Sequence, residues 1–447
     1  MQPLLPCPHS PAVQEVDIWI ESPSTRARYA VEQVIARLLG ITIRWVPNPA
    51  DLHPEVQPCL AYSENPVRGA FNLRPSGALI DGIKALTNPS ISQLGDLPIL
   101  FPVDGADLPF DPFAAAFFHL ARVEEWHALP HDEHGRPLTG ALHAAKHGYL
   151  HRPVVDEWAI QLAERWRAFD PRVPEPQRSY RQEATIDLDN GFKYLGREPW
   201  RSAGAWLRDL SHGCWHDAAE RIAVLRGTKP DPFVLDAELL HAIEASSTRL
   251  IAFVLAADRG PLDHAVPVEH PRYAAYLQSL AARIEIGLHP SYRSSLSEGL
   301  TAHEQARLST AVGKPIRSSR QHFLRFTTPG TFRTAIALGF QEEHSMGCHD
   351  RLGFRAGTCT PYPWYDLEHE QSTELMIHPF AVMDNTLSEK LRLSPDEAVR
   401  EASLIIETVK RVRGTFTGLW HDSFLAPTGE RAIWRDAILR IIRNAAP

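Results

Sequence analysis

The 447-residue chain is predicted to be an α/β protein in which a smaller α/β domain precedes a larger domain of alternating strands and helices. The main evidence is a regular alternation of short apolar segments with amphipathic segments, which begins near residue 184 and continues for roughly 260 residues. Such alternation is typical of parallel strands joined by crossover helices. It leaves open whether the strands form a barrel or a doubly wound sheet.

A proline-rich stretch at 168–182, AFDPRVPEPQRSYRQ, separates the two parts. It holds three prolines, several charges and few large apolar residues, a composition typical of a linker. We therefore predict domains over residues 1–175 and 181–447. With 44% hydrophobic and 22% charged residues, the chain has enough apolar side chains for two cores.

Hydrophobic spacing predicts the individual elements. In the first domain we expect a helix over 30–39, buried strands over 41–46 and 99–103, and a capped helix over 111–128. The second domain is expected to contain strands over 184–188, 249–256, 283–288, 315–319, 377–382 and 415–420. Its expected helices cover 272–282, 331–338 and 395–413.

Composition excludes several classes of function. The formal net charge is −8 and no Lys/Arg block occurs, so the electrostatic signature of a nucleic-acid or anionic-membrane binder is missing. No segment approaches the roughly 18 apolar residues of a membrane span, and we expect no signal peptide. The five cysteines form no C-x-x-C pair, which favours reduced thiols and a cytoplasmic location. Motifs of serine hydrolases, zincins, nucleoside triphosphatases and dinucleotide-binding proteins are absent.

A pair of carboxylates ends the first strand of the larger domain. The segment reads TIDLDN, and the alternation of strand side chains puts Asp187 and Asp189 on one face. Two carboxylates this close repel each other, and a bound cation relieves the repulsion while leaving one carboxylate free as a base. A turn with a helix cap explains the motif equally well when it stands alone.

Further polar residues follow the later strands. They are His289, Arg320, His322 and His421. A single histidine at such a place is more often structural than a ligand, but three at successive strand ends favour a site, because catalytic groups of βα barrels lie where strands end. A carboxylate with imidazoles from separate strands suits a divalent ion such as zinc, which keeps an open position for water.

Five motifs follow one another between residues 185 and 425: TIDLDNGF, IGLHPSYRS, GKPIRSSRQHF, GFRAGTCTPYPWYDL and GLWHDSF. In this order they resemble the polysaccharide deacetylases of the NodB homology type, in the subgroup with a separate α/β domain ahead of the barrel. The upstream segments AAAFFHLARVEEW and DEHGRPL resemble that leading domain. The resemblance implies a distorted (β/α) barrel and a metal-dependent hydrolase of carbon–nitrogen bonds. Its implied substrate is an N-acetylated amino sugar of a polysaccharide or glycan precursor.

The resemblance also implies roles for individual residues. Asp187 matches the family's catalytic base, and Asp189 matches its metal-ligating aspartate. His289 matches the first histidine ligand, Arg320 the arginine that orients the base, and His421 the histidine that protonates the leaving group. The implied cofactor is a divalent metal ion, for which the donor types favour zinc.

The sequence departs from the family pattern at one ligand. The second histidine expected four residues after the first is replaced by Arg293, whose guanidinium has no lone pair for a metal. His322 is our candidate replacement because it shares a strand face with Arg320. If His322 lies too far from Asp189, the site would bind metal weakly or not at all. Arg293 would then bind a substrate carboxylate or phosphate.

Candidates for a sugar groove lie in the segment GFRAGTCTPYPWYDL, since aromatic faces stack on pyranose rings and guanidinium groups recognise anions. Simple packing of a proline-rich loop explains these side chains equally well. The predicted substrate-binding residues are Asn190, Tyr292, Arg293, Arg355, Tyr362, Trp364 and Trp420. The HDEH run at 131–134 is interpreted as an exposed turn rather than a metal cluster.

Two other functions stay open at this point. A catalytically weakened glycan-binding protein on the same barrel would explain the missing second histidine. The same metal site would also suit hydrolysis of another amide or of an O-acyl ester. The leading domain carries no chemical motif, and we expect it to cover the barrel mouth or to bind a partner.

Overall fold

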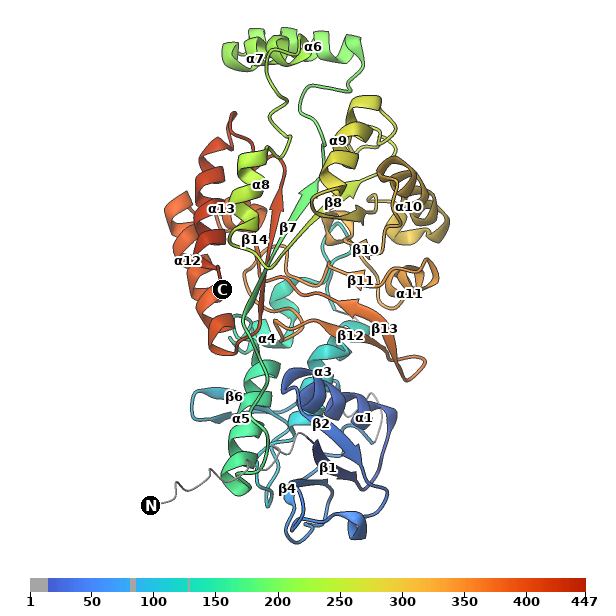
Figure 1. Ribbon diagram of the computed structural model, residues 1–447, viewed down its shortest axis with the longest axis vertical. Helices are drawn as coiled ribbons and strands as arrows, with labels where there is room; N and C mark the ends of the chain where they lie inside the picture. Colours follow the sequence, from blue (N-terminus) through green and yellow to red (C-terminus); the bar gives the residue numbers. More distant parts are fainter. Residues whose placement is uncertain (1–14, 81–85, 128) are drawn as a thin grey trace, which may run out of the picture. The chain divides into compact units, whose positions relative to one another are not determined.

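The computed structural model describes residues 15–80, 86–127 and 129–447. The chain forms two compact units, each assembled from segments that lie far apart in the sequence (Figure 1). The first unit comprises Met1–His127, Pro153–Ser179 and Tyr365–Thr373, and the second comprises Ala128–Arg152, Tyr180–Trp364 and Glu374–Pro447.

The passage from the first unit to the second at Ser179 lies inside the linker predicted at 168–182. The sequence did not predict that residues 128–152 belong to the second unit or that 365–373 belong to the first. The domain limits of 1–175 and 181–447 stay a prediction.

The first unit contains a four-stranded parallel sheet in the order β2-β1-β3-β4. Its strands are β1 (Glu15–Ile20), β2 (Thr42–Trp45), β3 (Cys59–Tyr62) and β4 (Phe71–Leu73). The unit also contains α1 (Thr25–Val31), η1 (Glu32–Leu38), η2 (Pro49–Asp51), β5 (Ile91–Leu94), β6 (Leu97–Leu100), α3 (Pro112–Leu120), η3 (Val123–Trp126) and α5 (Val154–Phe169).

Most element predictions for this unit are confirmed. The helix expected over 30–39 is the end of α1 together with η1, and the strand expected over 99–103 is β6, which lies two to three residues earlier. β2 is not buried as predicted, because it is an edge strand whose residues are exposed or half-buried. The helix expected over 111–128 is α3, which ends at Leu120, and residue 128 lies outside the described residues.

The second unit is built on a nine-stranded sheet in the order β12-β13-β11-β10-β9-β8-β7-β15-β14. From β13 to β14, neighbouring strands run parallel. The strands are β7 (Arg181–Leu188), β8 (Arg249–Leu255), β9 (Glu285–His289), β10 (Ser318–Ser319), β11 (Glu342–Glu343), β12 (Tyr362–Asp366), β13 (Gln371–Ile377), β14 (Val382–Met383) and β15 (Thr415–His421).

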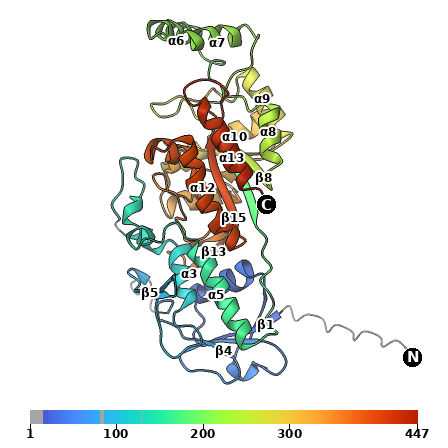
Figure 2. The ribbon, with the colours of Figure 1, turned by 90° about the vertical axis from the view of Figure 1, so that its left-hand side faces the viewer.

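Helices flank this sheet. Figure 1 shows α8, α12 and α13 beside β14 and β15, and α9, α10 and α11 beside β8, β10 and β11; in Figure 2, α12 and α13 lie in front of β15. The helices are α4 (His143–Lys146), α6 (Pro199–Ser211), α7 (Trp215–Leu225), α8 (Ala237–Glu244), α9 (Pro271–Ala281), α10 (Glu298–Val312), α11 (Gly330–Ala337), α12 (Pro395–Arg411) and α13 (Ala432–Asn444). Shorter turns are η4 (Thr139–Ala141), η5 (Ser294–Leu296), η6 (His322–Leu324) and η7 (Thr386–Lys390).

The sheet of the second unit is not a closed barrel over the described residues, which corrects the predicted distorted barrel. Its order runs from β12 at one edge to β14 at the other, with no pairing between them. β14 spans only two residues before the chain turns into η7, so it offers little backbone for a second neighbour. The fold is therefore mixed α/β with a largely parallel, open sheet.

Most predicted elements of the second unit are present. The strands expected over 184–188, 249–256, 283–288 and 415–420 are β7, β8, β9 and β15, and the three expected helices are α9, α11 and α12. The strand over 315–319 shortens to β10. The strand over 377–382 is wrong, because the chain between β13 and β14 contains Pro379, which has no N–H to donate to a ladder. The sequence did not predict α6, α7, α8, β12 or β13.

Cys59 and Cys214 are free thiols, in agreement with the expectation of reduced cysteines. In the described part of the chain, every helix is too short or too polar to span a lipid bilayer.

One face of the large sheet, called here the inner face, carries charged side chains at both ends of its strands. Near the strand starts, Arg249 Nη2 lies 2.7 Å from Glu342 Oε2. Near the strand ends, Arg320 Nη1 lies 2.9 Å from Asp187 Oδ1. Between them lies Phe253, whose ring centroid is 4.4 Å from the Arg320 guanidinium carbon. Along the strands, the inner face thus carries charged residues near the strand starts, an aromatic ring in the middle and charged residues near the strand ends.

Gly287 keeps the middle of this face closely packed. A Cβ there would lie 2.5 Å from two ring carbons of Phe253 and 3.1 Å from the Ser318 carbonyl oxygen. We expect Gly287→Ala to lower the free energy of unfolding by about 1–3 kcal/mol, measured by urea denaturation. Gly299→Ala in α10 is the control, since a Cβ there meets no atom within 4 Å. It should leave stability unchanged or raise it; equal losses in both variants would contradict this packing argument.

Candidate functional site

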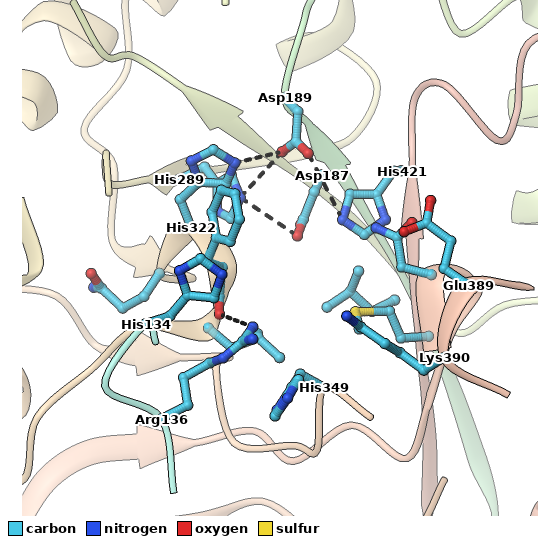
Figure 3. Close-up of a pocket in the computed structure, with 16 residues that line it drawn as sticks. His134, Arg136, Asp187, Asp189, His289, His322, His349, Glu389, Lys390 and His421 are labelled. Carbon is cyan, nitrogen blue, oxygen red and sulfur yellow. Dashed lines mark hydrogen bonds and ion pairs between the residues drawn. The ribbon is translucent and has the colours of Figure 1, made fainter. Parts of the chain in front are cut away.

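A pocket of about 190 Å³ lies at the carboxyl ends of the parallel strands (Figure 3). β7 supplies Asp187 and, just beyond its end, Asp189; β9 ends in His289 and β15 in His421. The predicted site residues that line the pocket are Asp187, Asp189, His289, His322 and His421. Figure 3 shows the two aspartates between His289 and His322 on one side and His421 on the other.

Asp189 is the meeting point of these side chains. Its Oδ1 atom lies 3.3 Å from Nε2 of His289 and 3.9 Å from Nε2 of His322. Oδ1 is buried, and neither contact has ordinary hydrogen-bond geometry. The three side chains can each present one ligand atom within 4.8 Å of the others, so they form a candidate metal cluster. His322 thus lies close enough to take the place of the missing second histidine.

Both imidazoles of this cluster are held by their Nδ1 atoms. His289 donates from Nδ1 to the carbonyl oxygen of Arg320. His322 Nδ1 lies 2.9 Å from Oδ1 of Asp263, and because a carboxylate only accepts, Nδ1 carries the hydrogen. When the rings are neutral, each Nε2 atom therefore has a lone pair directed toward Asp189. This arrangement, with Nδ1 hydrogen-bonded and Nε2 free, is the usual orientation of metal-ligating histidines.

Asp187 is paired with Arg320. The Asp187 side chain is 3% exposed and that of Arg320 is fully buried, with 2.9 Å between Nη1 and Oδ1. Arg320 also donates from Nε to the carbonyl oxygen of His344 at 3.0 Å. These contacts fix the guanidinium and leave Oδ2 of Asp187 facing the pocket, 3.7 Å from Nε2 of His289. Asp187 therefore has one oxygen, Oδ2, that is not occupied by Arg320 and is available as a base.

His421 is held by Asp384. Nδ1 of His421 lies 2.7 Å from Asp384 Oδ1, and the His421 backbone N–H donates to Oδ2 at 2.7 Å. Burial disfavours the imidazolium, but the charge and hydrogen bond of Asp384, together with Asp189 and Asp187, raise the pKa of His421 to about 10. Nε2 is thereby directed into the pocket, 3.9 Å from Asp189 Oδ2. His421 can donate a proton there.

The charges around Asp189 influence its neighbours. Burial would raise the pKa of Asp189, but His289, His322 and His421 outweigh burial and hold the pKa well below its ordinary value. Burial and the negative charge of Asp189 raise the pKa of Asp422 to about 7. Asp422 Oδ2 accepts the backbone N–H groups of Asn190 and Gly191 at 3.1 Å, which fixes the loop that follows Asp189.

The structure places the predicted substrate-binding residues outside the pocket lining. The amide of Asn190 faces Asp422, and Arg293 is exposed at the end of a turn. Tyr292 contacts His134 through its hydroxyl, at 3.1 Å from Nδ1. Arg355, Tyr362, Trp364 and Trp420 are buried. β12, which carries Tyr362 and Trp364, replaces the expected proline-rich loop, so these aromatic rings pack in the sheet. Their role in substrate binding stays a prediction.

The sequence missed several residues of the pocket. His134 and Arg136 line it; His134 ends the HDEH run at 131–134 that we interpreted as an exposed turn, and Arg136 follows two residues later. The turn itself is present: Asp132 Oδ1 accepts the backbone N–H groups of His134 and Arg136 at 2.9 Å. Arg136 also donates from Nη1 to the carbonyl oxygen of Phe323 at 2.9 Å. The motif DEHGRPL was a usable signal, but it was assigned to the leading domain.

Other missed residues act through long-range contacts. Asp263 and Asp384 hold His322 and His421, yet they are 59 and 37 residues away in sequence. Further pocket-lining residues that were not predicted are Gln321, Phe323, Leu324, His349, Met383, Asn385, Glu389, Lys390 and Leu419. Gln321 and Phe323 lie within the motif GKPIRSSRQHF and Leu419 within GLWHDSF, whereas no quoted motif marks the other six.

Comparisons with known proteins identify no characterised family for the whole chain. Residues 16–170 match a family of unknown function, DUF7033. No curated protein matches the chain. Solved structures that resemble it include polysaccharide deacetylases and other carbohydrate-acting proteins.

Three of these structures show the extent of the likeness. A polysaccharide deacetylase from Bacillus cereus is 12% identical, covers 60% of this chain and 87% of its own, and gives a TM-score of 0.29. A family 4 carbohydrate esterase from Streptomyces lividans, in complex with acetate, is 12% identical, with coverages of 60% and 87% and a TM-score of 0.30. A 4-alpha-glucanotransferase from Thermococcus litoralis is 14% identical, with coverages of 60% and 38% and a TM-score of 0.34. Scores this low do not establish a shared activity.

The Asp187–Arg320 pair should be a large contributor to stability because both partners are buried. We expect Arg320→Met to lower the free energy of unfolding by about 3–5 kcal/mol, since it leaves a buried carboxylate without its partner. Adding Asp187→Asn to this variant should recover part of the loss. Urea denaturation measures both effects.

The control is Arg283→Met, which removes a half-exposed pair with Glu244 whose Nη2 and Oε2 atoms lie 2.7 Å apart. Its cost should be no more than about 1 kcal/mol. Similar losses for Arg320→Met and Arg283→Met would show that the buried pair has no special role.

Proposed function

We propose that this protein is a metal-dependent hydrolase that removes N-acetyl groups from amino sugars of a polysaccharide or glycan precursor. The observation that carries the proposal is the pocket geometry. A carboxylate fixed by a guanidinium, a second carboxylate faced by two imidazole Nε2 atoms, and a third imidazole held by its own aspartate all meet in one small cavity.

The residues present fit a divalent ion. Asp189, His289 and His322 would hold it, because Asp189 Oδ1 is buried without a good hydrogen bond and both Nε2 lone pairs face it. A set of one oxygen and two nitrogen donors with an open position suits zinc. When bound, the ion would polarise the acyl carbonyl and lower the pKa of a coordinated water.

The protein's own side chains supply the proton transfers of amide hydrolysis. Asp187 takes a proton from the attacking water at Oδ2, because Oδ1 is occupied by Arg320. The new bond joins the water oxygen to the acyl carbon. The carbon–nitrogen bond then breaks as His421 donates its Nε2 proton to the departing nitrogen, which leaves as the amine. The products are acetate and the free amino sugar.

The pocket lining suits a small acyl group on a polar substrate. Leu324, Met383 and Leu419 line it and belong to one buried apolar cluster with Phe380. They offer a surface for a methyl group. Arg136, His134, His349, Asn385, Glu389 and Lys390 also line the pocket and provide hydrogen-bonding groups for sugar hydroxyls. A cavity of about 190 Å³ admits an acetyl group more readily than a long acyl chain.

Loss of the proposed base should abolish turnover. We expect Asp187→Asn to lower kcat/KM for acetate release from N-acetylated oligosaccharides by about 10²–10⁴-fold, because an amide cannot take up the proton. Asp258→Asn, which changes an exposed carboxylate paired with Arg307, is the control and should keep full activity. An Asp187→Asn protein with wild-type acetate release would contradict the proposal.

The same assay separates the alternative functions. Arg293 stands in the place of a usual ligand and is exposed, which favours a catalytically weakened glycan-binding protein. That alternative predicts glycan binding without acetate release or stoichiometric zinc. Release of acyl groups only from O-acylated sugars, or from other amides, would instead identify a different hydrolase on the same site.

Metal affinity should depend on Asp263, which holds His322. We expect Asp263→Asn to weaken zinc binding by about 10–100-fold, because an amide oxygen is a poorer acceptor and orients His322 less firmly. Competition with a chromophoric chelator measures the affinity. Asp258→Asn should bind zinc as the wild type does. Unchanged affinity in Asp263→Asn would remove His322 from the proposed ligand set.

A further inference from the structure

A second cluster of histidine and glutamate side chains lies at the other end of the inner face. Glu342 is in β11, His344 follows it, and His378 follows β13. His344 is fully buried and His378 is 7% exposed, while the Glu342 side chain is 23% exposed. Glu183 of β7 also contacts the cluster; it lies four residues before Asp187, which corresponds to roughly 13 Å along the strand. The cluster is therefore separate from the pocket.

The spacing of the donor atoms matches a metal centre. Nε2 of His344 lies 3.2 Å from Oε2 of Glu342, and Nε2 of His378 lies 3.6 Å from Oε1 of the same carboxylate. Two donors at about 2.1 Å from one tetrahedral ion are themselves about 3.4 Å apart. The three side chains can each present one ligand atom within 4.8 Å of the others.

The two imidazoles differ in their hydrogen bonds. His378 Nδ1 contacts Oε2 of Glu183 at 3.4 Å, so Nδ1 carries the hydrogen and Nε2 has the lone pair. His344 donates from Nε2 to Oε2 of Glu342 at 3.2 Å, and its Nδ1 is buried without a hydrogen-bond partner among the described residues. The two rings stack at a centroid distance of 4.3 Å, and two protonated rings would repel each other there. Both Nε2 atoms face one carboxylate, and His344 would offer its Nε2 lone pair to a cation once the ring hydrogen is on Nδ1.

The charges around this cluster also favour the binding of a cation. The three carboxylates Glu183, Glu285 and Glu342 share a single guanidinium, that of Arg249. Arg249 and Ser318 both contact Oε2 of Glu342, at 2.7 and 3.1 Å, which leaves Oε1 without either of them. With neutral imidazoles the group carries two excess negative charges. A divalent ion at Oε1 would neutralise them without displacing Arg249.

We propose that Glu342, His344 and His378 bind a divalent ion of the zinc type, with Glu183 orienting His378. The site is structural, because none of these three residues lines the pocket that holds the proposed base. The backbone of His344 links the site to the pocket. Its carbonyl oxygen accepts a hydrogen bond from Arg320 Nε, and Arg320 is paired with Asp187. The bound ion would thus help to keep the proposed base in place. The proposal does not depend on deacetylase activity.

The test measures the zinc stoichiometry of a variant in which the candidate metal cluster of the pocket has been removed. Asp189→Asn combined with His322→Gln removes two candidate ligands of the pocket. After dialysis against a chelator and addition of zinc, this double variant should keep one equivalent by elemental analysis, and zinc should raise its melting temperature. Adding Glu342→Gln and His378→Gln should abolish both effects. His216→Gln, which changes an exposed histidine beside Asp217 and Glu220, is the control and should change neither.

The outcomes distinguish the two metal proposals. A double variant without zinc, beside a wild type with one equivalent, would overturn the second site and support the first. A quadruple variant that still binds one equivalent would also overturn it. If the quadruple variant fails to fold, crystals of the wild-type protein soaked in zinc provide the measurement. Anomalous density between Glu342, His344 and His378 supports the proposal, and its absence at full occupancy of the pocket refutes it.

Discussion

The buried pair of Arg320 and Asp187 is the constraint on which the rest of the site depends. Burying a guanidinium inside a sheet is costly unless its charge is paired, and here Asp187 supplies the opposite charge although Nη2 of Arg320 has no hydrogen-bond partner among the described residues. Arg320 donates to Asp187 and to the His344 carbonyl, and its own carbonyl accepts from His289. One residue therefore sets the positions of groups on β7, β9 and β11. A shift of this side chain would move the proposed base and a proposed ligand together.

The histidines of the pocket are all held in the same way, through Nδ1. His289, His322 and His421 are each held at Nδ1, by a carbonyl, by Asp263 and by Asp384 respectively. Fixing one ring nitrogen determines the tautomer and the direction of the other. All three Nε2 atoms consequently converge on Asp189 before any ligand is present. The entropic cost of orienting these imidazole rings is therefore met during folding, which is the usual basis of catalytic preorganisation.

Sequence reasoning found the parts of this arrangement that follow from local rules. Alternation along β7 placed Asp187 and Asp189 on one face, and His289 and His421 lie at strand ends as expected. It could not find Asp263 or Asp384, because their contacts join loops separated by dozens of residues. It also could not decide between a barrel and an open sheet, because the alternation of apolar segments is the same in both. It could not decide the role of the aromatic residues of β12, since burial in a sheet and stacking on sugars favour the same side chains.

The inner face of the large sheet separates its charges into two groups. Phe253 lies between them, its ring 4.4 Å from the Arg320 guanidinium carbon and 5.0 Å from the centroid of His344. Charges separated by such an aromatic layer are screened less than in water, so an uncompensated charge in either group is costly. At the strand ends, two aspartates face one arginine; at the strand starts, three glutamates face one arginine. Each group therefore has an excess of carboxylate beside imidazole nitrogens with lone pairs, and a divalent cation is the ligand that both arrangements suit.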